Sequence, residues 1–211
     1  MSSKLAKCLV VPATVLWLSS VALAQDPSSN SSSAPTKQPT IAERKENQQD
    51  RIANGVKSGQ LTAGETANLE SKEAAINGET RADRAANGGK LTPAEKQQIN
   101  QQQNQLSKQI YQDKHNGNTA HYGNNAVGQR RENQQERIAQ GIKSGQLTAG
   151  ETAKLENQQK GINQQVKADR AANGGKLTPG EKQQINKEQN AASKNIYNKK
   201  HNGKTQAGTK K

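Results

Sequence analysis

The fold is decided by four copies of one short stretch: Ser58-Gly59-Gln60-Leu61-Thr62-Ala63-Gly64-Glu65, Gly88-Gly89-Lys90-Leu91-Thr92-Pro93-Ala94-Glu95, Ser144-Gly145-Gln146-Leu147-Thr148-Ala149-Gly150-Glu151 and Gly174-Gly175-Lys176-Leu177-Thr178-Pro179-Gly180-Glu181. Thr followed three residues later by Glu is a capping box, in which each residue's side chain accepts a hydrogen bond from the other's backbone N–H. The Gly before the Leu suits the left-handed end of a preceding helix. Each stretch therefore predicts that one helix ends, the chain turns tightly and a new helix begins.

The predicted helix caps are the Thr and the Glu of each stretch: Thr62, Glu65, Thr92, Glu95, Thr148, Glu151, Thr178 and Glu181. Two of the stretches also place Pro93 and Pro179 directly after the Thr. Pro is favoured there because its φ is already helical and its missing N–H has no partner to lose.

From Arg44 the chain repeats itself. Residues 44–116 and 130–202 align without gaps at an offset of 86, with 51 identities in 73 positions. A period this long, with helical patterning, predicts two copies of a small domain rather than a solenoid. In the first copy we expect three helices, at about 40–56, 62–86 and 92–115. Ile99, Leu106 and Ile110 of the last one are spaced seven and four apart.

The second copy repeats this pattern from about Gly128. Its apolar stripe is as narrow as that of the first copy, and Ala192 stands where the first copy has Leu106. So few apolar anchors indicate a marginally stable domain, or helices that form only on association.

Each stretch resembles the second half of an EF-hand loop, with Gly at position 6, Thr at position 9 and Glu at position 12. The first half does not match, because Arg84 and Arg170 stand at position 1 of two loops and an apolar residue stands at position 3 of all four. We therefore expect helix–loop–helix geometry and no cofactor. The alternative is weak calcium binding, by Asn54, Ser58, Glu65, Gln140, Ser144 and Glu151.

Motif and layout together resemble secreted bacterial proteins of unassigned function that carry degenerate EF-hand-like repeats with G-x-L-T-x-x-E turns. The resemblance implies an all-α fold, made of two tandem copies of a three-helix unit with EF-hand-like turns.

The ends of the chain differ in composition from the repeats. Residues 1–24 predict a secretory signal peptide, with Lys4 and Lys7, an apolar run and the cleavage site Ala22-Leu23-Ala24. An uncleaved N-terminal anchor is the alternative. After cleavage we expect no membrane span and a periplasmic or extracellular location.

Residues 25–40 predict a disordered Ser/Pro/Asn linker. The expected boundaries are then 41–116 for the first repeat, 117–129 for a Gly/Asn linker, 130–202 for the second repeat and 203–211 for a basic, flexible tail.

No catalytic constellation is present. The chain has no G-x-S-x-G, no HExxH and no Cys–His spacing, and its one Cys lies in the signal segment. We expect no enzyme activity. His115 and His201 are expected to cap helix ends, and Tyr111 and Tyr197 to pack against the core. The pairs Asp83-Arg84 and Asp169-Arg170 are interpreted as solvated helix charges.

The positive charge is the one general indication of a partner. Removal of residues 1–24 lowers the net charge from +13 to +11. Such a charge favours anionic lipid head groups, acidic polysaccharide or extracellular nucleic acid, although aromatic platforms for bases are lacking. The alternative is that the charge serves solubility. We expect a non-enzymatic exported structural or interaction module whose partner is an anionic polymer or a membrane surface. Its oligomeric state stays open.

Overall fold

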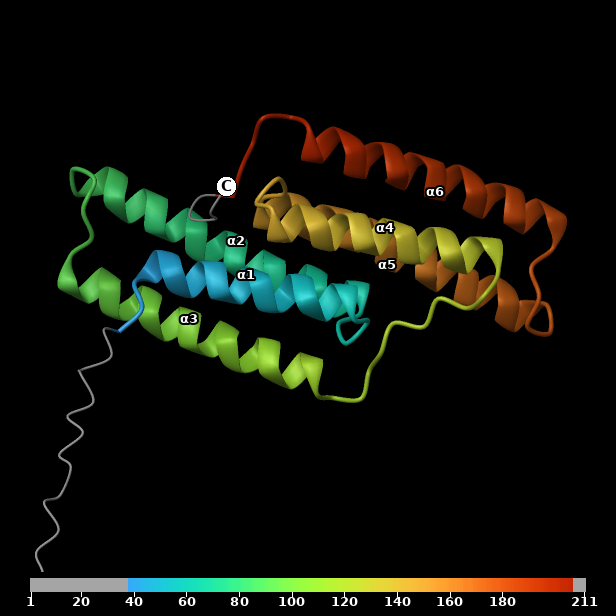
Figure 1. The fold of residues 1–211 in the computed structure, drawn as a ribbon, viewed down its shortest axis with the longest axis horizontal. Helices are drawn as coiled ribbons and strands as arrows, with labels where there is room; N and C mark the ends of the chain where they lie inside the picture. Colours follow the sequence, from blue (N-terminus) through green and yellow to red (C-terminus); the bar gives the residue numbers. More distant parts are fainter. Residues whose placement is uncertain (1–37, 207–211) are drawn as a thin grey trace, which may run out of the picture. The chain divides into compact units, whose positions relative to one another are not determined.

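The computed structural model describes residues 38–206, and over this range the chain is all-helical, without strands (Figure 1). Its six helices are α1 (Ile41–Lys57), α2 (Ala63–Ala86), α3 (Pro93–Lys114), α4 (Ala126–Lys143), α5 (Ala149–Ala172) and α6 (Pro179–Lys200). The predicted signal peptide, most of the 25–40 linker and residues 207–211 lie outside the described residues. Within the described range, no helix is long and apolar enough to cross a membrane.

Capping boxes begin five of the six helices. The Thr and Glu pairs at positions 62/65, 92/95, 148/151 and 178/181 cap α2, α3, α5 and α6. A fifth pair, Thr40 and Glu43, caps α1 in the same way. Helix α4 starts differently, because the side chain of Asn125 accepts a hydrogen bond from Gly128 N. Helix α4 therefore begins inside the segment 117–129 that was expected to be a linker, because Asn125 caps it without an acidic partner.

Leu61, in the turn between α1 and α2, is a core residue. Leu61 is fully buried, and its N–H donates to the carbonyl of Gly55 over 3.0 Å. A Cβ on Gly55 would lie 2.7 Å from the Leu61 side chain, so only Gly lets the turn fold back this closely. Gly59 between them has a φ of +71°, which Gly adopts without strain. Leu147 and Gly141 repeat the arrangement in the second half.

The two sequence repeats share one core. The most extensive contacts between helices join α2 to α5 and α1 to α4, whereas α2 touches α1 of its own half only slightly. One hydrophobic cluster draws on both halves: Ile52, Ala53, Val56, Leu61, Leu69, Ile76, Leu91, Ile99, Leu106, Ile110, Ile138, Ala139, Ile142, Leu147, Leu155 and Ile196. The apolar faces of α1 and α2 are thus covered to a large extent by α4 and α5 of the other half, whereas α3 and α6 pack on their own halves.

A second, smaller cluster belongs to the second half alone: Val127, Ile162, Val166, Leu177, Ile185 and Ala192. In the first half the equivalent positions Ile76, Leu91, Ile99 and Leu106 are part of the main cluster. Ala192 supplies less apolar volume than Leu106, so this end of the core is the thinner one.

Candidate functional site

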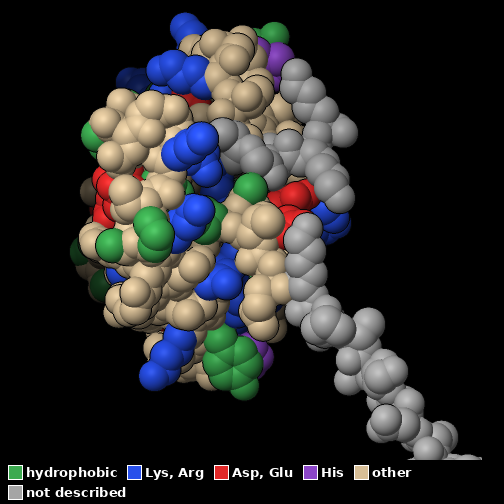
Figure 2. Space-filling view, turned by 90° about the vertical axis from the view of Figure 1, so that its left-hand side faces the viewer, with side chains coloured by type: hydrophobic (Ala, Val, Ile, Leu, Met, Phe, Trp, Pro, Cys, Tyr) green, Lys and Arg blue, Asp and Glu red, His purple; other side chains and the backbone are tan. Residues whose placement is uncertain are grey.

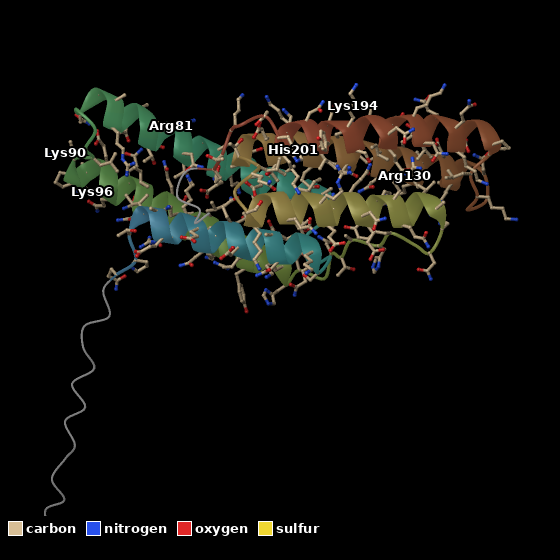
Figure 3. The ribbon with its side chains drawn as sticks, turned by 45° about the horizontal axis from the view of Figure 1, so that its top comes forward. Arg81, Lys90, Lys96, Arg130, Lys194 and His201 are labelled. Carbon is tan, nitrogen blue, oxygen red and sulfur yellow. The ribbon has the colours of Figure 1, made fainter. Side chains whose placement is uncertain are left out.

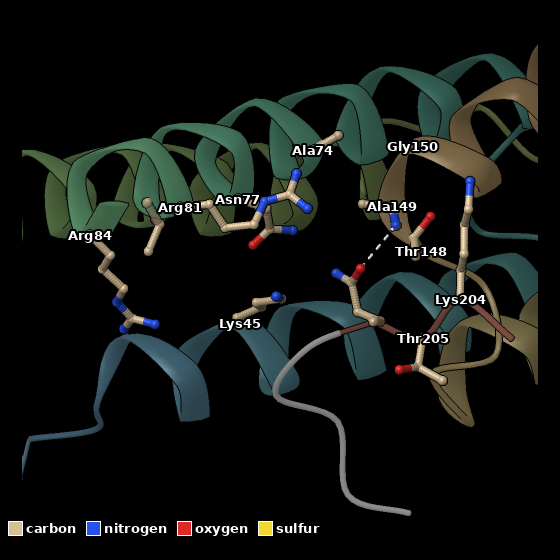
Figure 4. Close-up of a pocket in the computed structure, with 12 residues that line it drawn as sticks. Lys45, Ala74, Asn77, Arg81, Arg84, Thr148, Ala149, Gly150, Lys204 and Thr205 are labelled. Carbon is tan, nitrogen blue, oxygen red and sulfur yellow. Dashed lines mark hydrogen bonds between the residues drawn. The ribbon is translucent and has the colours of Figure 1, made fainter. Parts of the chain in front are cut away.

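Basic residues line a cleft where the two halves meet. It lies between α1, α2 and the N-terminus of α5, and we call it the first junction cleft (Figure 4). Lys45 of α1 and Arg84 of α2 point into the space between their helices. The lining residues are Lys45, Ala74, Asn77, Thr80, Arg81, Arg84, Thr148, Ala149, Gly150, Lys204, Thr205 and Gln206.

A second junction cleft lies at the positions displaced by 86 residues. It is formed by α4, α5 and the N-terminus of α2, and it is larger, about 700 Å³ against about 440 Å³. Its lining residues are Thr62, Ala63, Gly64, Thr119, Ala120, His121, Tyr122, Arg131, Lys160, Asn163, Gln164, Val166, Lys167 and Arg170. The duplicated sequence therefore builds two related clefts, each combining one half's helix N-terminus with the other half's cations.

Two further clefts, the end clefts, lie beside the N-termini of α1 and α4. The first contains Arg84, Lys90 and Lys96 together with residues 39–42, and the second contains Arg170, Lys176 and Lys182 together with residues 125–127. Figure 3 shows Arg81, Lys90 and Lys96 gathered around the α2–α3 end of the first half. Because Arg84 and Arg170 each line a junction cleft and an end cleft, the basic residues form a continuous run in each half.

The charge of these clefts is one-sided. Among the described residues, none of those lining the four clefts is Asp or Glu. Figure 2 shows Lys and Arg side chains spread over one face, with fewer acidic side chains between them. The Arg residues of Asp83-Arg84 and Asp169-Arg170, expected as solvated helix charges, are thus cleft residues.

In the first junction cleft, a buried carboxyl lies close to the cations. Burial lowers the pKa of Lys45, Glu73 raises it, and Arg81 and Arg84 lower it again. Burial raises the pKa of Glu73 to about 7, with Lys45 opposing the rise. Lys45 therefore has a titratable partner inside the protein.

The end of the described chain closes the same cleft. Gln206 is buried, and its Oε1 accepts a hydrogen bond from Ala149 N over 3.1 Å at the start of α5 (Figure 4). Its own N–H donates to the carbonyl of Gly145 over 2.9 Å. Within the segment expected to be a flexible tail, Gln206 thus bonds through its backbone and its side chain to the turn before α5 and to its first residue.

Arg131 of α4 is the most enclosed cation of the second junction cleft. Only 9% of it is exposed, and its Nε has no hydrogen-bond partner within the described chain. The guanidinium carbon lies 5.4 Å from the centroid of the Tyr122 ring, a cation–π distance. Burial lowers the pKa of Arg131; Tyr122 raises it and the nearby Arg170 lowers it. Two cations are thus held close together here.

Three carboxyls that the sequence analysis did not single out are buried along the α2–α5 contact: Glu70, Glu73 and Glu156. Glu70 accepts a hydrogen bond from Gln49 and Glu156 one from Gln135. Burial raises the pKa of Glu70 well above its usual range and that of Glu156 to about 8. A signal existed in the sequence, because Glu73 lies four residues after Leu69 and three before Ile76, on the apolar stripe.

The alternative calcium ligands are engaged in other bonds. Glu65 Oε2 accepts from the Thr62 N–H and hydroxyl, and its Oε1 accepts from Asn116 and Asn118. Ser58 Oγ donates to a backbone carbonyl and to Gln60. A calcium ion would have to displace these donors. The described residues also contain no cluster of three or more His, Cys, Asp or Glu able to hold a metal.

Glu151 is engaged in the same way: its Oε2 accepts from Thr148 and its Oε1 from Asn202. Asn54 and Gln140 each accept the backbone N–H of a helix C-cap, Ser58 and Ser144, on their carbonyl oxygens. The structure thus places all six residues of the calcium alternative at helix ends, where they bond to the chain itself.

The helix-end histidines and tyrosines form matching pairs. Nδ1 of His115 lies 2.7 Å from the carbonyl of Tyr111, and the rings stack at 4.2 Å. His201 and Tyr197 repeat both distances. The expectation that the tyrosines pack in the core is wrong, because Tyr111 is 61% and Tyr197 57% exposed. The Ile before each Tyr occupies the buried position.

No protein-family model matches the chain, and no curated protein or solved structure shows significant similarity to it.

Proposed function

We propose that this protein is an exported, non-enzymatic module that binds an anionic polymer through its basic clefts. The observation that carries the proposal is the set of four clefts lined by Lys and Arg without Asp or Glu. Charges that served solubility alone would be scattered among acidic groups on convex surface. Concave surfaces of one sign instead concentrate oppositely charged ligands.

A polymer fits this arrangement better than a membrane surface does. A helix that lies on a membrane buries an apolar face in it. Among the described residues, the large apolar side chains that are exposed are Tyr111 and Tyr197, and each is stacked on a His. An extended chain carrying sulfate, phosphate or carboxylate groups can instead pass along the basic surface and place its anionic groups near several of these Lys and Arg residues.

Two further parts of the proposal concern origin and location. The helices of the second half follow those of the first at the 86-residue offset, which supports two tandem copies of a three-helix unit with EF-hand-like turns. The resemblance to secreted bacterial proteins with such turns, and the pattern of residues 1–24, support export. A calcium function has no support from the bonding of Glu65 and Glu151.

The proposal is tested by binding of the full chain to immobilised heparin, a sulfated polysaccharide, at increasing salt. We expect retention at low salt and release as salt is raised, because ions screen the contacts. The variant R84Q/R170Q should elute at clearly lower salt than the wild type, since each residue lines two clefts. Vesicles of phosphatidylglycerol serve as the membrane arm of the same experiment.

The matched control is K108Q/K194Q. It removes the same two charges from equivalent exposed positions of α3 and α6 that line none of the clefts. Equal shifts for the two double variants would mean that net charge alone acts, and the cleft proposal would fail. Binding to vesicles without retention on heparin would reassign the partner to a membrane.

A further inference from the structure

The two junction clefts differ in how their positive charge is balanced. In the first, Lys45 lies near the buried carboxyl of Glu73. At the equivalent position of the second half stands Gln159, whose neutral amide donates to Gln134 over 3.1 Å. The second cleft therefore lacks the internal carboxyl, although it keeps Arg131, Lys167 and Arg170 at the positions of Lys45, Arg81 and Arg84.

The helix N-termini in the two clefts differ as well. At the start of α5, Gln206 Oε1 accepts a hydrogen bond from Ala149 N. At the start of α2 the equivalent residue is Ala120, which is held by the same backbone bond, from its N–H to the Gly59 carbonyl over 2.8 Å. Its methyl group cannot accept a hydrogen bond from Ala63 N. In the first cleft, an oxygen of the chain thus occupies the positive N-terminal end of α5. In the second cleft, the equivalent residue leaves the positive N-terminal end of α2 without this oxygen.

Arg131 supplies a second, independent observation. It is about nine-tenths buried in the second junction cleft, and its Nε has no hydrogen-bond partner within the described chain. The ring of Tyr122 faces the guanidinium but accepts no hydrogen bond from Nε, and leaving a buried N–H of a charged group unbonded is costly. The planar fork of guanidinium donors matches an oxyanion. Glu156, which lies near Tyr122, supplies little negative charge at neutral pH, because burial raises its pKa to about 8.

We infer that the second junction cleft is a binding site for a single phosphate or sulfate group. The guanidinium of Arg131 and the backbone N–H groups at the start of α2 bind the oxygens, and Arg170 and Lys167 add charge. In the first junction cleft, the chain itself supplies these interactions: the carboxyl of Glu73 lies near Lys45, and Gln206 Oε1 accepts a hydrogen bond at the start of α5. This inference rests on the proposed anion-binding function and names the chemical group that the clefted surface recognises.

The site is tested by titrating the full chain with inorganic phosphate, and in parallel with sulfate, while recording ¹H–¹⁵N NMR spectra. We expect saturable shifts at the Arg131 Nε–H and at the amides of Ala63 and Gly64. The equivalent amides of Ala149 and Gly150 should stay unchanged and act as an internal control. Small linear shifts in both clefts at once would overturn the site.

Variants can close one cleft and open the other. A120Q supplies the missing acceptor and Q159E the missing carboxylate, so each should weaken phosphate binding about tenfold. K108Q, at an exposed position of α3 that lines none of the clefts, should leave it unchanged. The double variant E73Q/Q206A should create saturable phosphate shifts at Ala149 and Gly150. Unchanged binding in both A120Q and Q159E would overturn the inference.

Binding to heparin separates this inference from the proposed function. Retention on heparin without saturable phosphate or sulfate shifts would overturn the discrete site and leave the proposed function standing. Saturable shifts at Arg131 without retention on heparin would support the site and overturn polymer binding.

Discussion

Two glycines inside helices of the first half differ in the space available for an added methyl group. A Cβ on Gly55 of α1 would lie 2.7 Å from the side chain of Leu61, the buried Leu of the turn that follows α1. A Cβ on Gly78 of α2 would meet nothing within 4 Å, and the second half has Gln164 at that position. The same substitution should therefore have opposite effects at the two sites.

We expect Gly55→Ala to lower the free energy of unfolding by about 1–3 kcal/mol, because Leu61 must shift in a packed core. Gly78→Ala should raise it by up to about 1 kcal/mol, the usual helix preference of Ala over Gly. Denaturant unfolding followed by circular dichroism measures both. Changes of the same sign in the two variants would contradict this account of the turn.

At the scale of elements, the capping residues join each turn to a distant segment. Glu65 caps α2 and also accepts hydrogen bonds from Asn116 and Asn118, which follow α3. Burial raises the pKa of Glu65, but the bonds from Asn116, Thr62 and Asn118 outweigh it and hold the pKa below its usual value. Glu151 is bonded in the same way to Thr148 and Asn202.

The variant N116A should therefore raise the pKa of Glu65 towards its usual value. The change is measured by titrating the Glu side-chain carbon resonances by NMR. The variant N202A is the control in the other half: it should raise the pKa of Glu151, where the Asn202 bond acts against burial, and leave Glu65 unchanged. A Glu65 pKa that does not respond to N116A would mean that the bonds from Thr62 and Asn118 set it.

For the whole molecule, the buried carboxyls predict that stability falls as pH rises from about 5 to 8. The pKa of Glu156 is about 8 and that of Glu70 is well above the usual range, so the folded protein binds more protons than the unfolded chain between these pH values. Stability then decreases with pH, by several kcal/mol if both groups act. The lowered pKa values of Glu65 and Glu151 act in the opposite direction, below about pH 4.

Thermal unfolding across pH 3–9 should accordingly show a maximum near pH 5. The double variant E70Q/E156Q keeps an oxygen to accept from Gln49 and Gln135 but cannot ionise. It should reduce the fall between pH 5 and 8, leaving the part that is due to Glu73, and be more stable than the wild type at pH 8. Stability that is constant or rises over this range in the wild type would contradict the prediction.

Local signals in the sequence determined the ends of the helices. The helices begin and end within a residue or two of the expected positions in the first half, because a capping box and a Gly act on neighbouring backbone. Helix α4 begins at Ala126, two residues before the expected start at about Gly128, and Asn125 caps it without an acidic partner. The basic residues were visible as net charge, but their division into clefts was not.

Only the tertiary structure decided how the halves pair. The apolar stripe of each half is too narrow to indicate its partner, and two similar stripes can face their own helices or each other's. The structure pairs α2 with α5 and α1 with α4. This pairing buries Glu70 and Glu156 and places the N-terminus of α2 beside Arg131. These properties depend on contacts between residues far apart in the chain, and no local pattern encodes them.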